Sequence, residues 1–237
     1  MEEDVMNLSK RLKKIIELAP KSRCIADIGT DHGYVASELI RSGKAERVIA
    51  TDINPQPLEK AVDTARRYHL EDKIDYRLGA GLKVLEPDEA DGIIIAGMGG
   101  SQTVEILEDS PRVVKELKFI LLQPAQNPEV VRKYLYDRHY RILSEDLVRE
   151  DDGRFYEFFK AAYDPSILGF SHNPMDFLLS PVLLKRHHPL IRSYILHAVQ
   201  EMEVVRSKLD MNYESSRIKN EELLKRKEYY LEELKWL

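Results

Sequence analysis

The fold is indicated by residues 23–33, RCIADIGTDHG, in which a short apolar run leads directly into a glycine-rich turn. Gly29 and Gly33 allow the backbone to bend sharply and to approach a ligand that a β-carbon would block. A helical pattern follows over residues 34–41. A strand, a tight turn and a helix in this order are typical of the first unit of an open α/β sheet.

The alternation of strand and helix patterns continues to residue 163. Further apolar runs typical of strands, and the helical patterns between them, lie at residues 46–51, 55–69, 74–78, 92–96, 101–109, 119–122 and 129–138. Residues 141–148 and 154–163 are then predicted to pair as a hairpin. This order predicts an α/β fold with a mostly parallel, Rossmann-like sheet and an antiparallel terminal hairpin, as in class I methyltransferases.

The composition changes after residue 164, and helix signals then run without a strand to residue 237. Apolar residues recur at spacings of three and four on both sides of a polar turn at residues 210–216. This pattern predicts a C-terminal antiparallel two-helix extension, coiled-coil-like in character. We therefore expect two domains, a methyltransferase domain over residues 1–164 and a helical hairpin over residues 165–237.

Length and composition narrow the class of protein. The 237 residues fit one large domain or an ordinary domain with an appendage, and 43% apolar residues suffice for a buried core. No apolar stretch has the length needed to span a bilayer, and the charged first 14 residues lack a signal core. The single cysteine, Cys24, excludes an internal disulfide and leaves too little thiolate for a zinc cluster. We expect a cytoplasmic protein with no membrane segment and no metal.

The net charge of −5 argues mildly against a nucleic-acid partner. Net charge describes only the long-range field, however, and a local basic face can still follow a phosphate backbone. Two basic clusters of the predicted extension are candidates for such a face, namely Lys185, Arg186, His187 and His188, and Lys225, Arg226 and Lys227. Acidic residues are as numerous on the extension, so solvated structural helices remain as good an interpretation as a substrate-binding arm.

The turn after the first predicted strand has the charge of a site for a cationic ligand. A dinucleotide site carries the pattern G-x-G-x-x-G, which presents backbone amides to a pyrophosphate. This turn instead carries Asp27 and Asp31, whose negative charge is unfavourable beside a pyrophosphate and therefore disfavours a nicotinamide oxidoreductase. It suits S-adenosylmethionine, which has an ammonium and a sulfonium group. The alternative for Asp31 is a helix cap.

Three further strand ends extend the candidate site. Asp52 follows the second predicted strand, where an acid can accept both ribose hydroxyls or, alternatively, cap the next helix. Backbone amides near Ala80 and Gly81 are placed to meet an adenine edge. Residues 97–100, GMGG, predict a close backbone approach to a ligand. They lack the Asp/Asn-Pro-Pro-aromatic tetrad that binds exocyclic amines in many methyltransferases, so a ring nitrogen is the favoured methyl acceptor.

Four motifs resemble, in order and spacing, those of the bacterial tRNA (adenine-22, N1 nitrogen) methyltransferases. They are residues 8–12 (LSKRL), 26–32 (ADIGTDH), 95–100 (IAGMGG) and 122–124 (LQP). The resemblance extends over nearly the whole chain, and it implies S-adenosylmethionine as cofactor and tRNA as partner. There are two departures. Ala80 stands where the family usually has an aspartate, and residues 123–127 are longer than the family's short segment.

Methyl transfer from a sulfonium is an in-line displacement, so alignment of the reactants is the main task. Methylation makes the adenine cationic, and a carboxylate that accepts a hydrogen bond from its amino group would stabilise that charge and take the proton. Asp31 is the candidate for this catalytic role, with Tyr34 or Met98 supporting the unstacked base. The predicted cofactor-binding residues are Asp27, Gly29, Thr30, His32, Gly33, Asp52, Ile53, Ala80, Gly81, Gly97, Met98 and Gly99.

Two other functions are compatible with these residues. One is methylation of a small molecule or a protein, which the acidic balance of the chain would suit. The other is a non-catalytic regulator that binds S-adenosylmethionine and docks a partner protein through its helical arm. We expect the tRNA methyltransferase, acting as a monomer.

Overall fold

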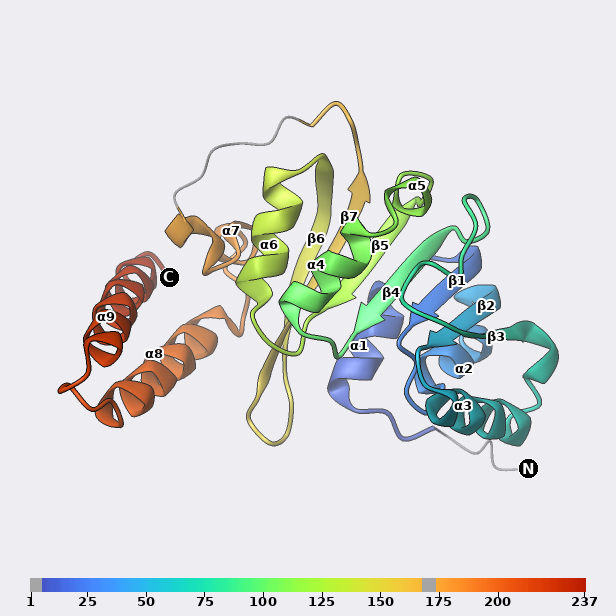
Figure 1. Cartoon of the computed structure of the whole chain (residues 1–237), viewed down its shortest axis with the longest axis horizontal. Helices are drawn as coiled ribbons and strands as arrows, with labels where there is room; N and C mark the ends of the chain where they lie inside the picture. The colour runs from blue at the N-terminus through green and yellow to red at the C-terminus, as the bar shows by residue number, and fades with distance from the viewer. Residues whose placement is uncertain (1–5, 168–173) are drawn as a thin grey trace. The chain divides into compact units, whose positions relative to one another are not determined.

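The computed structural model describes residues 6–167 and 174–237, which fall into two compact units, residues 1–171 and 172–237 (Figure 1). The first unit is an α/β domain, and the second is helical. The elements of the first unit are α1 (Lys10–Leu18), β1 (Ser22–Ile28), α2 (Tyr34–Arg41), β2 (Ala45–Asp52), α3 (Pro55–Arg67), the short 3-10 helix η1 (Glu71–Lys73), β3 (Ile74–Leu78), β4 (Gly92–Ala96), α4 (Gly100–Glu108), α5 (Pro111–Val114), β5 (Phe119–Gln123), α6 (Pro128–Asp137), β6 (Tyr140–Arg149) and β7 (Phe155–Tyr163).

The seven strands form one sheet in the order β3-β2-β1-β4-β5-β7-β6. Strands β1 to β5 pair in parallel, so their carboxyl ends lie at the same edge of the sheet. Strand β7 is antiparallel to β5 and to β6, and it is joined to β6 by a turn that contains Gly153 at φ +91°. The predicted fold class, a mostly parallel Rossmann-like sheet with an antiparallel terminal hairpin, is confirmed.

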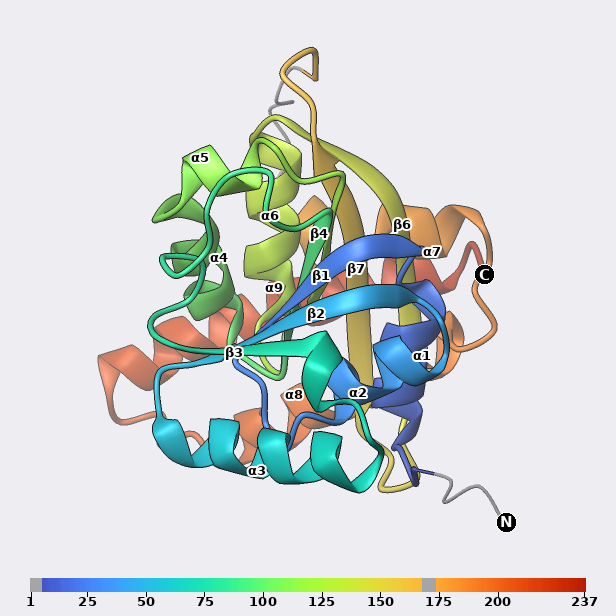
Figure 2. The ribbon, with the colours of Figure 1, turned by 90° about the vertical axis from the view of Figure 1, so that its right-hand side faces the viewer.

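Helices cover both faces of the sheet because its central strands are apolar on both sides. In β4, Ile94 belongs to the core beneath α1 and α2, whereas Ile93 and Ile95 belong to the core beneath α4, α5 and α6. All three isoleucines are fully buried. Figure 2 shows the two groups of helices on opposite sides of the strands. Burial on both faces explains why the strands read as continuous apolar runs in the sequence.

The observed elements differ from the predicted ones at a few points. Helix α1 and the short helix α5 were not predicted. Helix α3 ends at Arg67 instead of residue 69, because His69 adopts a left-handed conformation at φ +55°. The amide of Leu70 then donates to the carbonyl of Ala65 at 2.9 Å, which closes the end of the helix.

A buried charge cluster joins α6 to the β6–β7 hairpin. The Arg132 side chain has no exposed surface, and its guanidinium contacts Glu145, at 3.1 Å from Nε, and Glu157. Glu145 also accepts a hydrogen bond from the Tyr136 hydroxyl at 3.0 Å. Both carboxylates are themselves buried. Removal of the arginine would leave two buried acids without their cation, which is costly.

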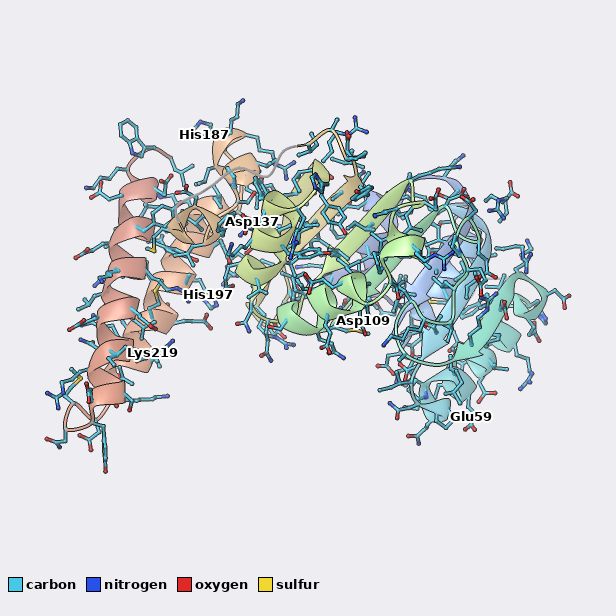
Figure 3. All side chains as sticks on the ribbon, turned by 45° about the horizontal axis from the view of Figure 1, so that its top comes forward. Glu59, Asp109, Asp137, His187, His197 and Lys219 are labelled. Carbon is cyan, nitrogen blue, oxygen red and sulfur yellow. The ribbon has the colours of Figure 1, made fainter. Side chains whose placement is uncertain are left out.

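The second unit contains η2 (Pro174–Phe177), α7 (Pro181–Lys185), α8 (Ile191–Ser207) and α9 (Glu214–Leu234). Helices α8 and α9 form an ion pair between Glu203 and Lys227 at 2.7 Å, and Arg206 donates to Asn220 at 2.9 Å. Figure 3 shows His197 on α8 and Lys219 on α9. The predicted helical pair is thus present. Within the described part of the chain, no helix combines the length and the apolar character needed to cross a membrane.

Candidate functional site

The first of two cavities in the α/β unit lies at the carboxyl ends of β1, β2 and β3 and has a volume of about 460 Å³. Six of the predicted cofactor residues line it, namely Gly29, Asp52, Ile53, Ala80, Gly81 and Met98. Helix α4 and the residues after it supply the opposite wall, with Gln102, Glu105, Ile106 and Asp109 among them. Asp109, which follows α4, is labelled in Figure 3. Residues predicted from four separate strand ends are thus brought together.

Backbone hydrogen bonds fix the loops around this cavity. The amides of Gly29 and Thr30 both donate to the carbonyl of Thr51 at 2.8 Å, which ties the first loop to the end of β2. The amide of Gly79 donates to the carbonyl of Asp52 at 2.8 Å, which ties the third loop to the second. The cavity therefore has preformed walls made of backbone that the sheet holds in place.

Asp27 lies beneath the first loop and is buried. Its carboxylate accepts a hydrogen bond from the Thr30 hydroxyl at 2.8 Å. Burial raises the pKa of Asp27 to about 6; the bond from Thr30 opposes this rise, and the charge of Asp52 adds to it. A buried carboxylate with a raised pKa is stabilised in its ionised form by a nearby cation. This environment fits a ligand that brings positive charge to the first loop.

Asp52 and Ile53 form the part of the rim at the end of β2. The Asp52 carboxylate accepts the amide of Asn54 at 2.8 Å, so it caps the turn before α3 and also lines the cavity. Ile53 is 63% exposed, which is unusual for isoleucine. An acid able to accept hydroxyl hydrogen bonds beside an uncovered apolar side chain suits a ribose next to a flat base.

Several predicted residues of the first loop line neither cavity. The Asp31 side chain is 77% exposed, and it lies 3.4 Å from the His32 ring nitrogen. His32 in turn stacks on Tyr34, with ring centroids 5.5 Å apart. Gly33, at φ +65°, packs against Ala61 of α3, and a β-carbon there would lie 2.7 Å from the Ala61 β-carbon. The contribution of Gly33 is close helix packing.

The loop after β4 separates the two cavities. Met98 lines the first, and its terminal methyl group lies where a β-carbon on Gly29 would be, 2.1 Å away. Gly97, at φ +82°, lines the second cavity. Gly99 begins α4 as its N-terminal cap residue. Adjacent residues of one short loop therefore face two different cavities.

The second cavity has a volume of about 550 Å³ and was not predicted, apart from Gly97. It is lined by Ser9, Arg11, Gly97, Ala125, Glu150, Asp151, Asp152, Arg154 and Tyr156. These residues come from the start of α1, the loops after β4 and β5, and the turn of the β6–β7 hairpin. Ionisable side chains make up most of the wall, in contrast to the first cavity.

Arg11 connects the walls of the second cavity. Its guanidinium donates to the Gln123 side-chain oxygen at 2.6 Å and lies 5.6 Å from the centre of the Tyr156 ring. Its backbone amide donates to Glu150 at 2.6 Å. Arg11 and Gln123 belong to two of the motifs quoted above, residues 8–12 and 122–124. Those motifs were the available signal for this cavity, although they gave no indication that the two residues meet.

No group of three or more His, Cys, Asp or Glu side chains placed to hold a metal ion occurs among residues 6–167 and 174–237. The chemistry of the two cavities is therefore described by hydrogen bonds, charge and aromatic surface.

The sheet order, with its ligand cavity at the carboxyl edge, defines the class as a Rossmann-like methyltransferase fold. Residues 8–159 match the family model of the methyltransferase domain, and the chain belongs to that family. Over 152 residues it is 36% identical to the tRNA (adenine(22)-N(1))-methyltransferase of Bacillus subtilis (strain 168). That alignment covers 64% of this chain and 63% of the relative, which is less than two thirds of its length.

Solved structures are similar over almost the whole chain. The crystal structure of the B. subtilis M1A22 tRNA methyltransferase has a TM-score of 0.82 and 29% identity, covering 97% of this chain and 100% of its own. A Streptococcus pneumoniae protein solved in complex with S-adenosyl-L-methionine has a TM-score of 0.78 and 27% identity, covering 96% and 100%. The resemblance indicated by the four motifs is confirmed.

Proposed function

We propose that the chain is an S-adenosylmethionine-dependent methyltransferase that methylates the N1 nitrogen of adenine at position 22 of tRNA. The observation that carries the proposal is the similarity to the B. subtilis structure, which covers 97% of the chain and includes the C-terminal helices. The cavity that brings Asp52, Ile53 and Met98 together supports the choice of cofactor.

S-adenosylmethionine supplies a methyl group on a cationic sulfur when it is bound. Asp27 and the loop above it favour its positive charge, since the raised pKa of Asp27 reflects a buried carboxylate that lacks a neighbouring cation. Asp52 accepts hydrogen bonds from ribose hydroxyls, and Ile53 covers one face of the adenine. The backbone of Ala80 and Gly81 meets the adenine edge. The remaining proposed contacts come from Gly29, Thr30, His32, Gly33, Gly97, Met98 and Gly99.

Asp31 is our proposal for the catalytic carboxylate. The loop that carries it contacts Met98 through Gly29, so it lies next to the boundary between the two cavities. There it accepts a hydrogen bond from the amino group of the target adenine and takes its proton after methylation. A carboxylate in this position stabilises the positive charge that the base acquires.

The two parts of the chain have different proposed roles. Residues 1–164 bind the cofactor and catalyse transfer, whereas residues 165–237 form an arm that contacts the tRNA. All the side chains around both cavities come from a single chain, so a monomer suffices. A bacterial enzyme of this kind acts in the cytoplasm, where its tRNA substrates are.

The proposal is tested with a pair of tRNA transcripts that differ only at position 22. Each is incubated with the full chain and S-adenosylmethionine carrying a radioactive methyl group, and the label retained on RNA is counted. The transcript with adenine should be labelled, and the transcript with guanine should not. Equal labelling of the two would contradict the assignment of position 22. No label on either, with cofactor binding intact by calorimetry, would reject tRNA as the substrate.

A further inference from the structure

The second cavity adjoins the proposed site of methyl transfer and has no role in cofactor binding. Gly97 lines it, and the next residue, Met98, lines the first cavity. Even a β-carbon placed on Gly97 would have its nearest neighbour, the Arg11 guanidinium, 3.5 Å away, so the space beside this glycine is open. A group held in the second cavity therefore has a path past Gly97 toward the end of the first.

The walls of this cavity are suited to a flat, electron-rich ring. Tyr156 supplies an aromatic side chain that is half-buried against the core. The Arg11 and Arg154 guanidinium carbons lie 5.6 Å and 5.8 Å from the centre of its ring. Flat stacking on the ring would bring them to about 3.5–4 Å, so a face of the tyrosine is not closely covered. Stacking on such a face is worth about 1–3 kcal/mol per base.

Charge at the rim is arranged in pairs. Lys10 contacts Asp151 at 2.5 Å, and Arg154 contacts Asp152 at 2.6 Å. Glu150 accepts the amide of Arg11. The cations are placed where the phosphates flanking an unstacked nucleotide would pass, and the carboxylates favour a base that becomes cationic on methylation.

We propose that the second cavity receives the target adenine, with Tyr156 as its stacking surface and Arg11 as a positioning residue that holds Tyr156 and Gln123 in place. This inference rests on the proposed function and assigns its base-binding site. It differs from the sequence-based expectation that Tyr34 or Met98 supports the base, because Tyr34 stacks on His32 and lines neither cavity.

The test couples Tyr156 to the target base. Wild type, Tyr156→Phe and Tyr156→Leu are compared with Tyr68→Leu, a matched control. Tyr68 packs against the same core, beneath a guanidinium at 4.8 Å, and lines neither cavity. Affinity is measured, with S-adenosylhomocysteine present, for intact tRNA and for tRNA that lacks the base at the target position. Methyl transfer to intact tRNA is measured as kcat/KM, and cofactor affinity by calorimetry reports folding.

The Leu variant should lower kcat/KM by about 10- to 100-fold, as expected for loss of one base–aromatic stack. It should also lower the ratio of intact-tRNA to abasic-tRNA affinity by a similar factor, because only the intact tRNA can use the ring. The Phe variant and Tyr68→Leu should stay within about threefold of wild type in both measurements. Arg11→Met, which keeps the ring but removes its neighbour, should give an intermediate ratio.

The inference is overturned if Tyr156→Leu keeps the wild-type affinity ratio, whatever happens to its turnover. A wild-type ratio for Arg11→Met removes the positioning role of Arg11. If wild type transfers no methyl group to intact tRNA, the proposed function itself fails, and that result is distinct from a wild type that is active and insensitive to Tyr156.

Discussion

The two cavities of the α/β unit are neighbours but are built differently. The first is enclosed by loops that follow consecutive parallel strands, and its polar contacts include backbone that the sheet fixes. The second is enclosed by segments from both ends of the unit, and side chains such as Arg11 and Tyr156 form its walls. The difference separates a cofactor site, which recurs in many proteins of this class, from a site that must recognise one particular substrate.

The supports of the two cavities differ as well, and this gives the largest expected effect. The hairpin that carries Tyr156 is anchored by the buried contacts of Arg132 with Glu145 and Glu157. Arg132→Met should lower the free energy of unfolding by about 3–5 kcal/mol, because two buried carboxylates lose their cation. Arg66→Met, which breaks the exposed pair with Asp63, should cost less than about 1 kcal/mol. Urea denaturation gives both values, and equal stability of the two variants would contradict the anchoring role.

Catalysis offers the next largest effect and asks which cavity supplies the carboxylate. Asp31→Asn keeps the shape and one acceptor oxygen but removes the charge, so turnover should fall by about 100-fold with cofactor affinity within a few-fold. Asp63→Asn is the control, because its side chain is similarly exposed, at 72% against 77%. Should Asp31→Asn be as active as this control while Glu150→Gln is inactive, the catalytic carboxylate lies in the second cavity instead.

Asp27 makes the stability of the first cavity dependent on pH. Its pKa in the fold is about 6, above the ordinary value of 3.8, so the fold favours the protonated form. This contribution is complete below about pH 4 and is lost as the pH rises through 6, at a cost of about 2–3 kcal/mol. Asp27→Asn should remove the loss, and the variant without cofactor should therefore be more stable than wild type at pH 8 but not at pH 4.

The control for this titration is Asp91, whose pKa shifts the other way. Burial alone would raise the pKa of Asp91, but hydrogen bonds from Lys118 at 2.8 Å and the Cys24 amide at 3.0 Å lower it overall. Asp91→Asn should therefore destabilise the protein at neutral pH, with the deficit shrinking in acid. Parallel unfolding curves for wild type and Asp27→Asn across this range of pH would show that Asp27 does not titrate as described.

Asp52 tests the cofactor side of the comparison alone. Asp52→Ala should weaken S-adenosylmethionine binding by about 1–3 kcal/mol, the cost of leaving hydrogen-bonding groups without a partner. Binding of tRNA without cofactor should be unchanged, since Asp52 lines only the first cavity. Calorimetry measures both, and an unaltered cofactor affinity would remove Asp52 from the site.

The helical arm gives the smallest expected effect. If its basic residues meet phosphates, reversing Lys185 and Arg186 to glutamate should reduce the salt dependence of tRNA affinity by about 0.9 or less for each lost contact. Lys227 is already paired with Glu203, so the second cluster has less to offer. Reversal of Lys60 on α3 is the control for net charge. A double reversal that binds tRNA with the original affinity and salt slope assigns the arm a structural role.

The fold was predictable because its signals are local. Gly29, Asp52 and the hairpin turn each lie within a few residues of the strand that they follow, and regular alternation fixes how those strands are ordered in space. The second cavity lacked such a signal. Arg11 and Gln123 are separated by 112 positions, and their hydrogen bond depends on α1 docking beside the end of β5. Gly33 illustrates another limit, because a glycine required for helix packing resembles one required for ligand approach.

The most direct test of the account is the chemical identity of the methylated nucleoside. tRNA is incubated with the full chain and a cofactor that carries a deuterated methyl group, then digested to nucleosides and separated before mass spectrometry. The account predicts that the label is found in 1-methyladenosine, because the loop after β4 lacks the groups that bind an exocyclic amine. Label in N6-methyladenosine or in another base, or no label in any nucleoside, would contradict it.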